Sequence, residues 1–238
     1  MYVDGNSKLI RIFVHLANGY GARNWQQRWA SGQILGINER PAYGYFRAAE
    51  DGCSIVYSED MKENWLQKLF RLGIRFLLGF DFVHAWRNRK GIFESDVVWT
   101  HTESQHLAIL SLFRILFWKR KPKLIAQSVW LFDRWQRFGL MRRWLYSALL
   151  SKADILTVHS PENLKVARAA FPKVRSELVL FGINADSFAP LKNRPIGRPI
   201  RILSLGNDKH RDWPTLIRAV KALPDVYLKI ASRRVSDR

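Results

Sequence analysis

The sequence contains little cysteine, comparatively little negative charge and no long uninterrupted apolar run. Its one cysteine, Cys53, excludes an internal disulfide and a multi-cysteine metal site, and precedes an apolar stretch that favours a small core residue over a nucleophile. The strongest apolar candidate, 107–118, contains Arg114 and is shorter than the roughly 20 residues of a membrane span. We therefore expect no metal site, no spanning helix and no signal peptide, and we expect a reducing, cytoplasmic compartment.

Positive charge dominates the composition. The chain has 39 Lys and Arg against 20 Asp and Glu, a formal net charge of +19. Such a balance predicts attraction to nucleic acid, anionic lipid headgroups or phosphorylated substrates. No nucleic-acid-binding motif is recognisable, so we do not expect nucleic acid as the partner. A dense basic cluster has only Asp133 as a nearby opposing charge, and consists of Arg114, Lys119, Arg120, Lys121, Lys123, Arg134, Arg137, Arg142 and Arg143.

Strand and helix patterns alternate along the chain. Strands are predicted at 8–17, 54–57, 96–101, 124–129, 155–158 and 200–205, and helices at 23–35, 61–78, 103–119, 134–151, 161–170 and from 215 onward. This alternation predicts an α/β fold with a doubly wound, parallel, Rossmann-like sheet. The basic Pro/Gly stretch at 191–199 is typical of a linker. We therefore expect an N-terminal domain at 1–190 and the beginning of a second Rossmann-like domain at 200–238.

The predicted helix at 61–78 is amphipathic, with two interpretations left open. Its apolar residues lie broadly on one side, and its basic residues recur on another. The apolar residues are Trp65, Leu66, Leu69, Phe70, Phe76 and Leu77, and the basic residues are Lys68, Arg71 and Arg75. A basic amphipathic helix is typical of a membrane-surface or partner-binding element. Alternatively, the apolar face is packed into the core and the basic face is solvated.

Two glycine loops follow predicted strands. Gly19 and Gly21 lie in Asn18-Gly-Tyr-Gly21, where the missing Cβ lets backbone approach a phosphate. The last glycine of a dinucleotide-binding motif is absent, so we expect no nicotinamide or flavin cofactor. An ordinary strand-to-helix turn is the alternative.

The second loop begins at Gly206 and Asn207 and continues through Lys209 and Arg211 to a helix start. Cations beside a helix N-terminus are unfavourable unless an anion joins them, which favours a phosphate site. A solvated loop is the alternative.

Polar and aromatic residues follow two further strands. His101 ends one strand, where ligands of doubly wound folds gather, and a histidine there can contact a sugar hydroxyl or shuttle a proton. Glu103, Trp130 and Asp133 are candidate acceptor or sugar contacts, because aromatic faces beside a carboxylate suit sugars. Alternatively, His101 is a hydrogen-bonded structural residue, Glu103 interacts with the helix dipole, and the aromatic residues around Trp130 pack in the core.

The order of four segments resembles family 4 glycosyltransferases, which have the GT-B architecture of two facing Rossmann-like domains. The segments are Ser95-Asp-Val-Val-Trp-Thr-His101, 153–160, 179–190 with its Gly182 and Phe188-Ala-Pro190, and 202–219 with Gly206 and Arg211. The resemblance covers nearly the whole chain.

This resemblance implies transfer of a sugar from a nucleotide-sugar donor to a polysaccharide or lipid-linked glycan acceptor, with no required metal. It implies that Gly19 and Gly21 approach the donor phosphates or the acceptor, and that His101 contacts the transferring sugar. Arg211 corresponds to the diphosphate-binding lysine. The chain departs from the family pattern at Asn207, where the family has arginine, and at Asp212, where it has glycine.

The family's Glu-x7-Glu donor-binding segment is not in the sequence, so we expect a truncated second domain. Two strands and one helix cannot bury both faces of a parallel sheet. The alternatives are a non-catalytic polyanion- or membrane-binding remnant, or a nucleotide-sugar epimerase or hydrolase. We expect a peripheral location on the inner face of an anionic membrane, where a lipid-linked acceptor resides.

Overall fold

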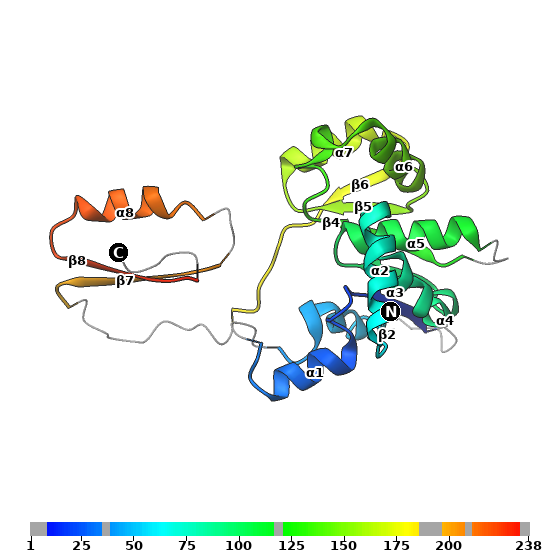
Figure 1. The fold of residues 1–238 in the computed structure, drawn as a ribbon, viewed down its shortest axis with the longest axis horizontal. Helices are drawn as coiled ribbons and strands as arrows, with labels where there is room; N and C mark the ends of the chain where they lie inside the picture. The colour runs from blue at the N-terminus through cyan, green and yellow to red at the C-terminus, as the bar shows by residue number, and fades with distance from the viewer. Residues whose placement is uncertain (1–8, 35–38, 117–120, 186–196, 208–210, 234–238) are drawn as a thin grey trace, which may run out of the picture. The chain divides into compact units, whose positions relative to one another are not determined.

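The computed structural model describes residues 9–34, 39–116, 121–185, 197–207 and 211–233. The chain divides into two compact units, a first unit at Met1–Asn184 and a second unit at Ala185–Arg238 (Figure 1). Most of the predicted linker at 191–199 and the end of the predicted first domain at 190 lie outside the described residues. These domain boundaries therefore stay predictions.

A six-stranded parallel sheet forms the first unit. Its strands pair in the order β2-β1-β3-β4-β5-β6, and every pairing is parallel. The strands are β1 (Ile10–His15), β2 (Cys53–Tyr57), β3 (Val97–Thr100), β4 (Lys123–Ser128), β5 (Ile155–Val158) and β6 (Arg175–Leu178). The predicted Rossmann-like sheet is confirmed. The strand order reverses at β1, which makes the β1–β3 border the switch point where ligands of such sheets bind.

Helices connect these strands. They are α1 (Ala22–Ala30), η1 (Ala42–Ala49), α2 (Trp65–Leu78), α3 (Phe82–Arg87), α4 (Arg89–Glu94), α5 (Glu103–Ile115), η2 (Trp135–Arg137), α6 (Leu140–Leu150) and α7 (Pro161–Ala170). The helix predicted at 134–151 begins only at Leu140, because Gly139 occupies the N-cap position. The short helices η1, α3 and α4 carry no periodicity long enough to predict them.

Apolar side chains fill both faces of the sheet because successive strand residues point to opposite sides. Phe13 and Val98 belong to a large cluster with residues of α3, α5, α6 and α7. Val14 packs in a smaller cluster with Trp25 of α1, and Trp99 packs against it. This two-sided burial explains why β3 and β5 consist almost entirely of apolar residues.

The second unit contains β7 (Ile200–Leu205), α8 (Trp213–Lys221) and β8 (Val226–Ala231), and β7 pairs with β8 in parallel. Trp213 and Val220 are its buried helix residues. Helix α8 begins before the predicted start at Thr215, because the Asp212 side chain accepts the Thr215 backbone N–H at 3.1 Å. The strand–helix–strand unit agrees with the predicted start of a second Rossmann-like domain.

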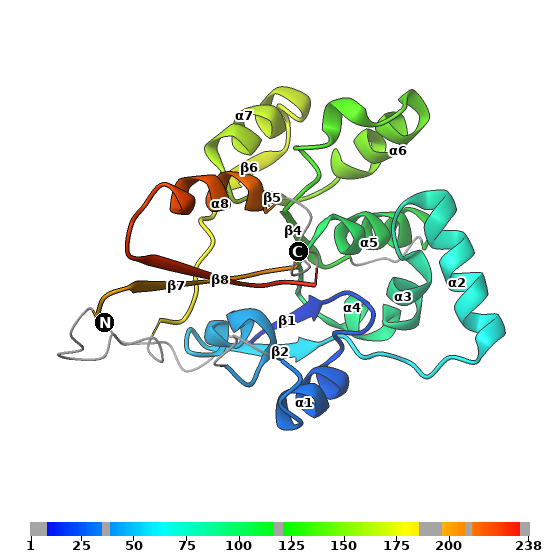
Figure 2. The same cartoon turned by 60° about the vertical axis from the view of Figure 1, so that its left-hand side comes forward.

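Helix α2 lies on the outer side of α3, and its orientation contradicts one interpretation of the sequence (Figure 2). Arg71 is its buried residue at 5% exposure, whereas Trp65 is 73% and Phe76 82% exposed. The Arg71 guanidinium contacts Glu63 at 2.8 Å and Asp81 at 2.5 Å. The expectation that the apolar face packs into the core is wrong, because these carboxylates turn the arginine inward.

No helix in the described part of the chain is both long and apolar enough to cross a bilayer.

We predict that Arg71→Ala lowers the free energy of unfolding by about 3–5 kcal/mol, because it leaves Asp81 buried without its ion-pair partner and removes one of the two arginines that pair with Glu63. Urea denaturation measures the change. Arg75→Ala is the matched control on the same helix, where an exposed side chain changes stability by no more than about 0.5 kcal/mol. Equal effects of the two substitutions would contradict the structural role of Arg71.

Candidate functional site

The candidate site is the carboxyl edge of the first unit's sheet. The loops after β1 and β3 flank the switch point, and the loops after β2 and β4 lie beside them because all these strands are parallel neighbours. The loops after β1, β2, β3 and β4 carry Gly19 and Gly21, Asp60, His101 and Trp130, respectively. The topology therefore brings residues from distant parts of the sequence to one edge.

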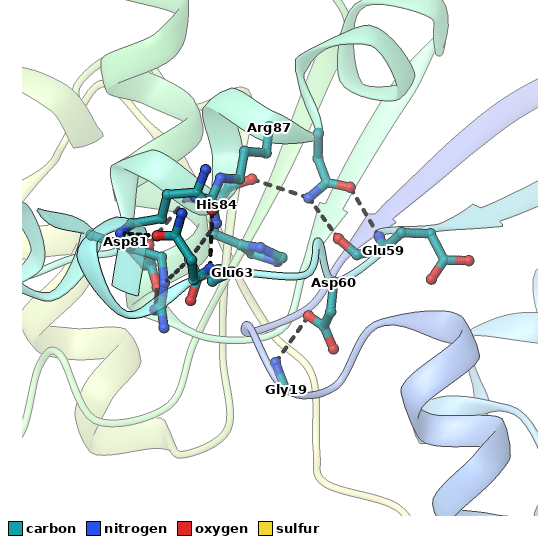
Figure 3. Close-up of polar contacts among 11 residues, drawn as sticks. Gly19, Glu59, Asp60, Glu63, Asp81, His84 and Arg87 are labelled. Carbon is teal, nitrogen blue, oxygen red and sulfur yellow. Dashed lines mark hydrogen bonds and ion pairs between the residues drawn. The ribbon is translucent and has the colours of Figure 1, made fainter. Parts of the chain in front are cut away.

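The first glycine loop is closed by a carboxylate. The backbone N–H groups of Gly19 and Gly21 donate to the two oxygens of Asp60 at 2.9 and 3.0 Å. Figure 3 shows the contact with Gly19. Asn24 donates to the Gly19 carbonyl oxygen at 2.6 Å and to Asp60 at 3.3 Å. Gly19 has φ of +97°, and a Cβ on Gly21 would lie 2.5 Å from the Asp60 nitrogen. The loop therefore requires glycine at both positions.

This arrangement bears on the predicted phosphate contact. The N–H groups that were predicted to approach a phosphate donate to Asp60, so a phosphate would have to replace that carboxylate to receive them. The phosphate role of Gly19 and Gly21 stays a prediction. Sequence reasoning missed Asp60, although its position directly after a strand that neighbours β1 is a usable signal.

His101 follows β3 and is enclosed by aromatic side chains. Its Nδ1 lies 2.9 Å from the Tyr45 hydroxyl, and its ring stacks on Tyr43 with centroids 3.9 Å apart. Its carbonyl oxygen accepts from the Gln127 amide at 3.1 Å. Because Tyr45 engages Nδ1, Nε2 is the ring nitrogen that remains for a ligand.

Burial, with a smaller contribution from His159, lowers the pKa of His101 to about 4. The imidazole is therefore neutral near pH 7, where it can exchange hydrogen bonds with a hydroxyl but is a weak proton acceptor. Burial also raises the pKa of Tyr45, so its hydroxyl stays protonated. Of the two predicted roles for His101, hydroxyl contact fits this environment better than proton shuttling.

The backbone at Tyr43 is unusual. Tyr43 and Gly44 have φ of 58° and 70°, both in the left-handed region that non-glycine residues rarely adopt. This turn within η1 brings the Tyr43 ring against His101 and places it 5.2 Å from the Trp25 ring. Strained backbone of this kind concentrates at functional sites. Sequence reasoning missed Tyr43 and Tyr45, for which the aromatic run around Gly44 is the only signal.

Glu103 connects two loops of the site. It is the first residue of α5, and its carboxylate accepts the backbone N–H groups of Val129 and Trp130 at 3.2 Å each. It thus positions the loop after β4. The Trp130 side chain is half exposed and Asp133 is exposed nearby in sequence. The predicted sugar or acceptor contacts of all three residues stay predictions.

In the second unit, Arg211 packs on the glycine loop. Gly206 has φ of +155°, and a Cβ there would lie 2.7 Å from the Arg211 Nε. Asp212 caps α8, and its pKa is lowered by its hydrogen bonds with Thr215. The structure thus brings Gly206 and Arg211 together beside a helix N-terminus, which is the arrangement expected of an anion site.

Asn207 contacts the segment that follows β8. Its side-chain oxygen accepts the Arg233 backbone N–H at 2.7 Å. Lys209 lies outside the described residues. The predicted phosphate contacts of Asn207, Lys209 and Arg211 stay predictions.

Comparison with solved structures shows the fold. The chain is similar to sucrose-phosphate synthase from Thermosynechococcus elongatus, with a TM-score of 0.56 and 15% identity over 92% of the chain and 62% of that structure. It is also similar to Arabidopsis thaliana UGT89C1 complexed with UDP-L-rhamnose, with a TM-score of 0.45 and 11% identity over 94% of the chain and 66% of that structure. The chain thus spans less than two thirds of the synthase.

No protein-family model matches the chain, and no curated protein matches it. The α/β, GT-B-like fold class predicted from the sequence is confirmed by the likeness to the synthase structure.

We predict that Asp60→Asn lowers the free energy of unfolding by about 1–3 kcal/mol, because an amide NH₂ then faces a backbone N–H of the glycine loop. Asp133→Asn is the matched control, as an exposed change at the same sheet edge. Urea denaturation of both variants measures the difference. An Asp60→Asn protein as stable as the control would contradict the locking role of Asp60.

We predict that His101 titrates near pH 4 in NMR spectra of its imidazole, and that Tyr43→Ala raises this pKa toward 6.5 by exposing the ring. Because the unfolded chain takes up this proton near pH 6.5, the free energy of unfolding decreases as the pH falls from about 6.5 to about 4. Tyr227→Ala, at an exposed tyrosine of the second unit, leaves the titration unchanged. Titration of His101 above pH 6 would contradict its burial.

Proposed function

We propose that the chain acts as a glycosyltransferase of the family 4 type, moving a sugar from a nucleotide-sugar donor to a polysaccharide or lipid-linked glycan. One observation carries the proposal: His101 stands at the carboxyl end of β3, beside the switch point of a GT-B-like sheet. There it is neutral and clamped by Tyr43 and Tyr45. The likeness to sucrose-phosphate synthase supports it through the fold.

The proposed role of His101 follows from its protonation. A neutral imidazole whose Nδ1 is held by Tyr45 presents Nε2 to a hydroxyl of the transferring sugar. Such a contact orients the sugar without placing a positive charge beside its reacting carbon. Stacked aromatic rings hold the imidazole plane fixed, so the contact is preorganised.

The proposed role of Arg211 is to hold the donor diphosphate. Arginine presents a planar fork of N–H donors to phosphate oxygens, and Arg211 lies beside Gly206 near the N-terminus of α8. As a nucleoside diphosphate leaves, negative charge accumulates on its oxygens, and a fixed guanidinium and helix N-terminus stabilise that charge. Retention of the anomeric configuration is part of the proposal through the family 4 resemblance.

On the acceptor side, exposed Trp130 and Asp133 offer an aromatic face and a carboxylate to sugar hydroxyls. Glu103 fixes the loop that carries them through its contacts with the Val129 and Trp130 backbone. A lipid-linked acceptor would place the protein at the cytoplasmic face of a membrane.

A second candidate is a non-catalytic polyanion- or membrane-surface-binding protein. It is favoured by the carboxylates that already occupy the predicted anion-binding N–H groups. Asp60 accepts from Gly19 and Gly21, and Asp212 accepts from Thr215.

We predict that Arg211→Ala weakens binding of a nucleoside diphosphate about 10- to 100-fold, because a charge-assisted hydrogen bond contributes about 1.5–3 kcal/mol. Isothermal titration calorimetry with UDP, GDP and ADP measures the affinity. Lys221→Ala, at the opposite end of α8, is the matched control and keeps wild-type affinity.

Unchanged affinity in Arg211→Ala would reject its phosphate role. Absence of binding by the wild-type chain to every diphosphate and to the matching sugar nucleotides would reject the enzymatic proposal and leave the non-catalytic candidate.

A further inference from the structure

Helices α2 and α6 present a large apolar surface to solvent, which we call the outer patch. All of its side chains are exposed: Trp65, Leu66, Leu69, Phe70, Phe76 and Leu77 from α2, and Leu140, Met141 and Trp144 from α6. Clustered exposed apolar residues on this scale mark an interaction surface, because a soluble protein rarely leaves them in water.

Ion pairs on the side of α2 opposite its apolar face hold that face toward solvent. At about 100° per residue, the centre of the apolar arc lies opposite Arg71. Arg71 is anchored by Glu63 and Asp81, and Glu63 also pairs with Arg87. Rotating the apolar face inward would expose and separate these ion pairs. The exposure of the outer patch is therefore built into the packing of α2.

The two helices meet at the C-terminal end of α2. Gly79, which ends α2 with φ of 82°, lies so close to α6 that a Cβ would collide with the Tyr146 hydroxyl. Tyr146 also donates to the Leu78 carbonyl oxygen at 3.2 Å. The end of α2 is thus hydrogen-bonded to α6.

The charged side chains of the two helices themselves are of one sign. The sequences of α2 and α6 contain no acidic residue. At about 100° per residue, Lys68 and Arg75 fall between Arg71 and the edge of the α2 apolar arc. Arg142 and Arg143 follow Met141 in sequence but lie off the apolar side of α6, Arg142 toward Gly79 and Arg143 toward the Trp135 ring. The Arg142 guanidinium carbon lies 3.4 Å from the position of a Gly79 Cβ, at the junction of the helices.

We propose that the outer patch docks on the surface of an anionic lipid bilayer. In this arrangement α2 lies in the plane of the interface, with its tryptophan, phenylalanine and leucine side chains at the boundary between headgroups and acyl chains. Lys68, Arg75, Arg142 and Arg143 contact the lipid phosphates.

The positive charge of the protein favours an anionic bilayer over a second copy of the chain as the partner of the outer patch. Two copies that met through the outer patch would bring their cations together, within proteins that each carry a net charge of +19. An anionic bilayer neutralises the same cations while it buries the apolar side chains.

Co-sedimentation with vesicles tests the proposal. The chain is expected to bind vesicles of phosphatidylglycerol and phosphatidylcholine far more strongly than vesicles of phosphatidylcholine alone. Binding weakens as NaCl rises from about 0.1 to about 0.5 M, because salt screens the charges. The double substitution W65Q/F76Q lowers the partition coefficient about tenfold or more, since buried apolar area contributes to binding.

Matched variants distinguish vesicle binding through the outer patch from binding through the overall positive charge of the protein. Trp144→Gln tests α6 independently, and Ile115→Gln removes an exposed apolar residue outside the outer patch without an effect on binding. Circular dichroism confirms that each variant is folded. Vesicle binding that survives W65Q/F76Q and Trp144→Gln would overturn the proposal. A dimer that dissociates in W65Q/F76Q, without vesicle binding by the wild type, would assign the outer patch to a second copy. The vesicle assay contains no sugar nucleotide, so its outcome is independent of the proposed glycosyltransferase activity.

Discussion

The buried ion cluster around Arg71 determines how the helical layer of the first unit is assembled. Arg71 joins α2 to Glu63 in the preceding segment and to Asp81, which caps α3 by accepting the His84 N–H at 3.2 Å. The Asp81 backbone N–H in turn donates to the Ser104 hydroxyl of α5 at 3.1 Å. Through these few contacts the outermost helix is tied to α5, which packs on the sheet. Burying an ion pair has a large desolvation free energy. Here the ion pairs nevertheless specify one orientation of α2, whereas apolar packing alone would have favoured the opposite orientation.

A second theme is the use of the chain's own carboxylates as acceptors for backbone N–H groups at loop and helix starts. Asp60 accepts the N–H groups of the first glycine loop, Glu103 accepts those of the loop after β4, and Asp212 accepts one at the start of α8. Backbone N–H groups at loop and helix starts attract any anion, and an internal carboxylate supplies one in the absence of ligand. In the first unit, Asp60 and Glu103 also hold the loops of the sheet edge in place.

Local patterns were sufficient to predict the parallel sheet, the position of most helices and the glycine loop after β1. Those features depend on residue period and on glycine, which can be read within a short window. The orientation of α2 could not be predicted in this way, because it depends on Glu63 and Asp81 meeting Arg71 from outside the helix. The environment of His101 was equally hidden. Its partners Tyr43, Tyr45 and Gln127 come from η1 and β4, and only the strand order brings them together.

The locked glycine loop has a consequence for how this sheet edge can diversify. Loops that follow parallel strands carry few of the hydrogen bonds that hold a sheet together, so their residues can be exchanged while the scaffold persists. The loop after β1 is more constrained, because Gly19, Gly21 and Asn24 all donate hydrogen bonds to Asp60. The turn after β1 can therefore change only if its partner Asp60 in the neighbouring loop changes with it.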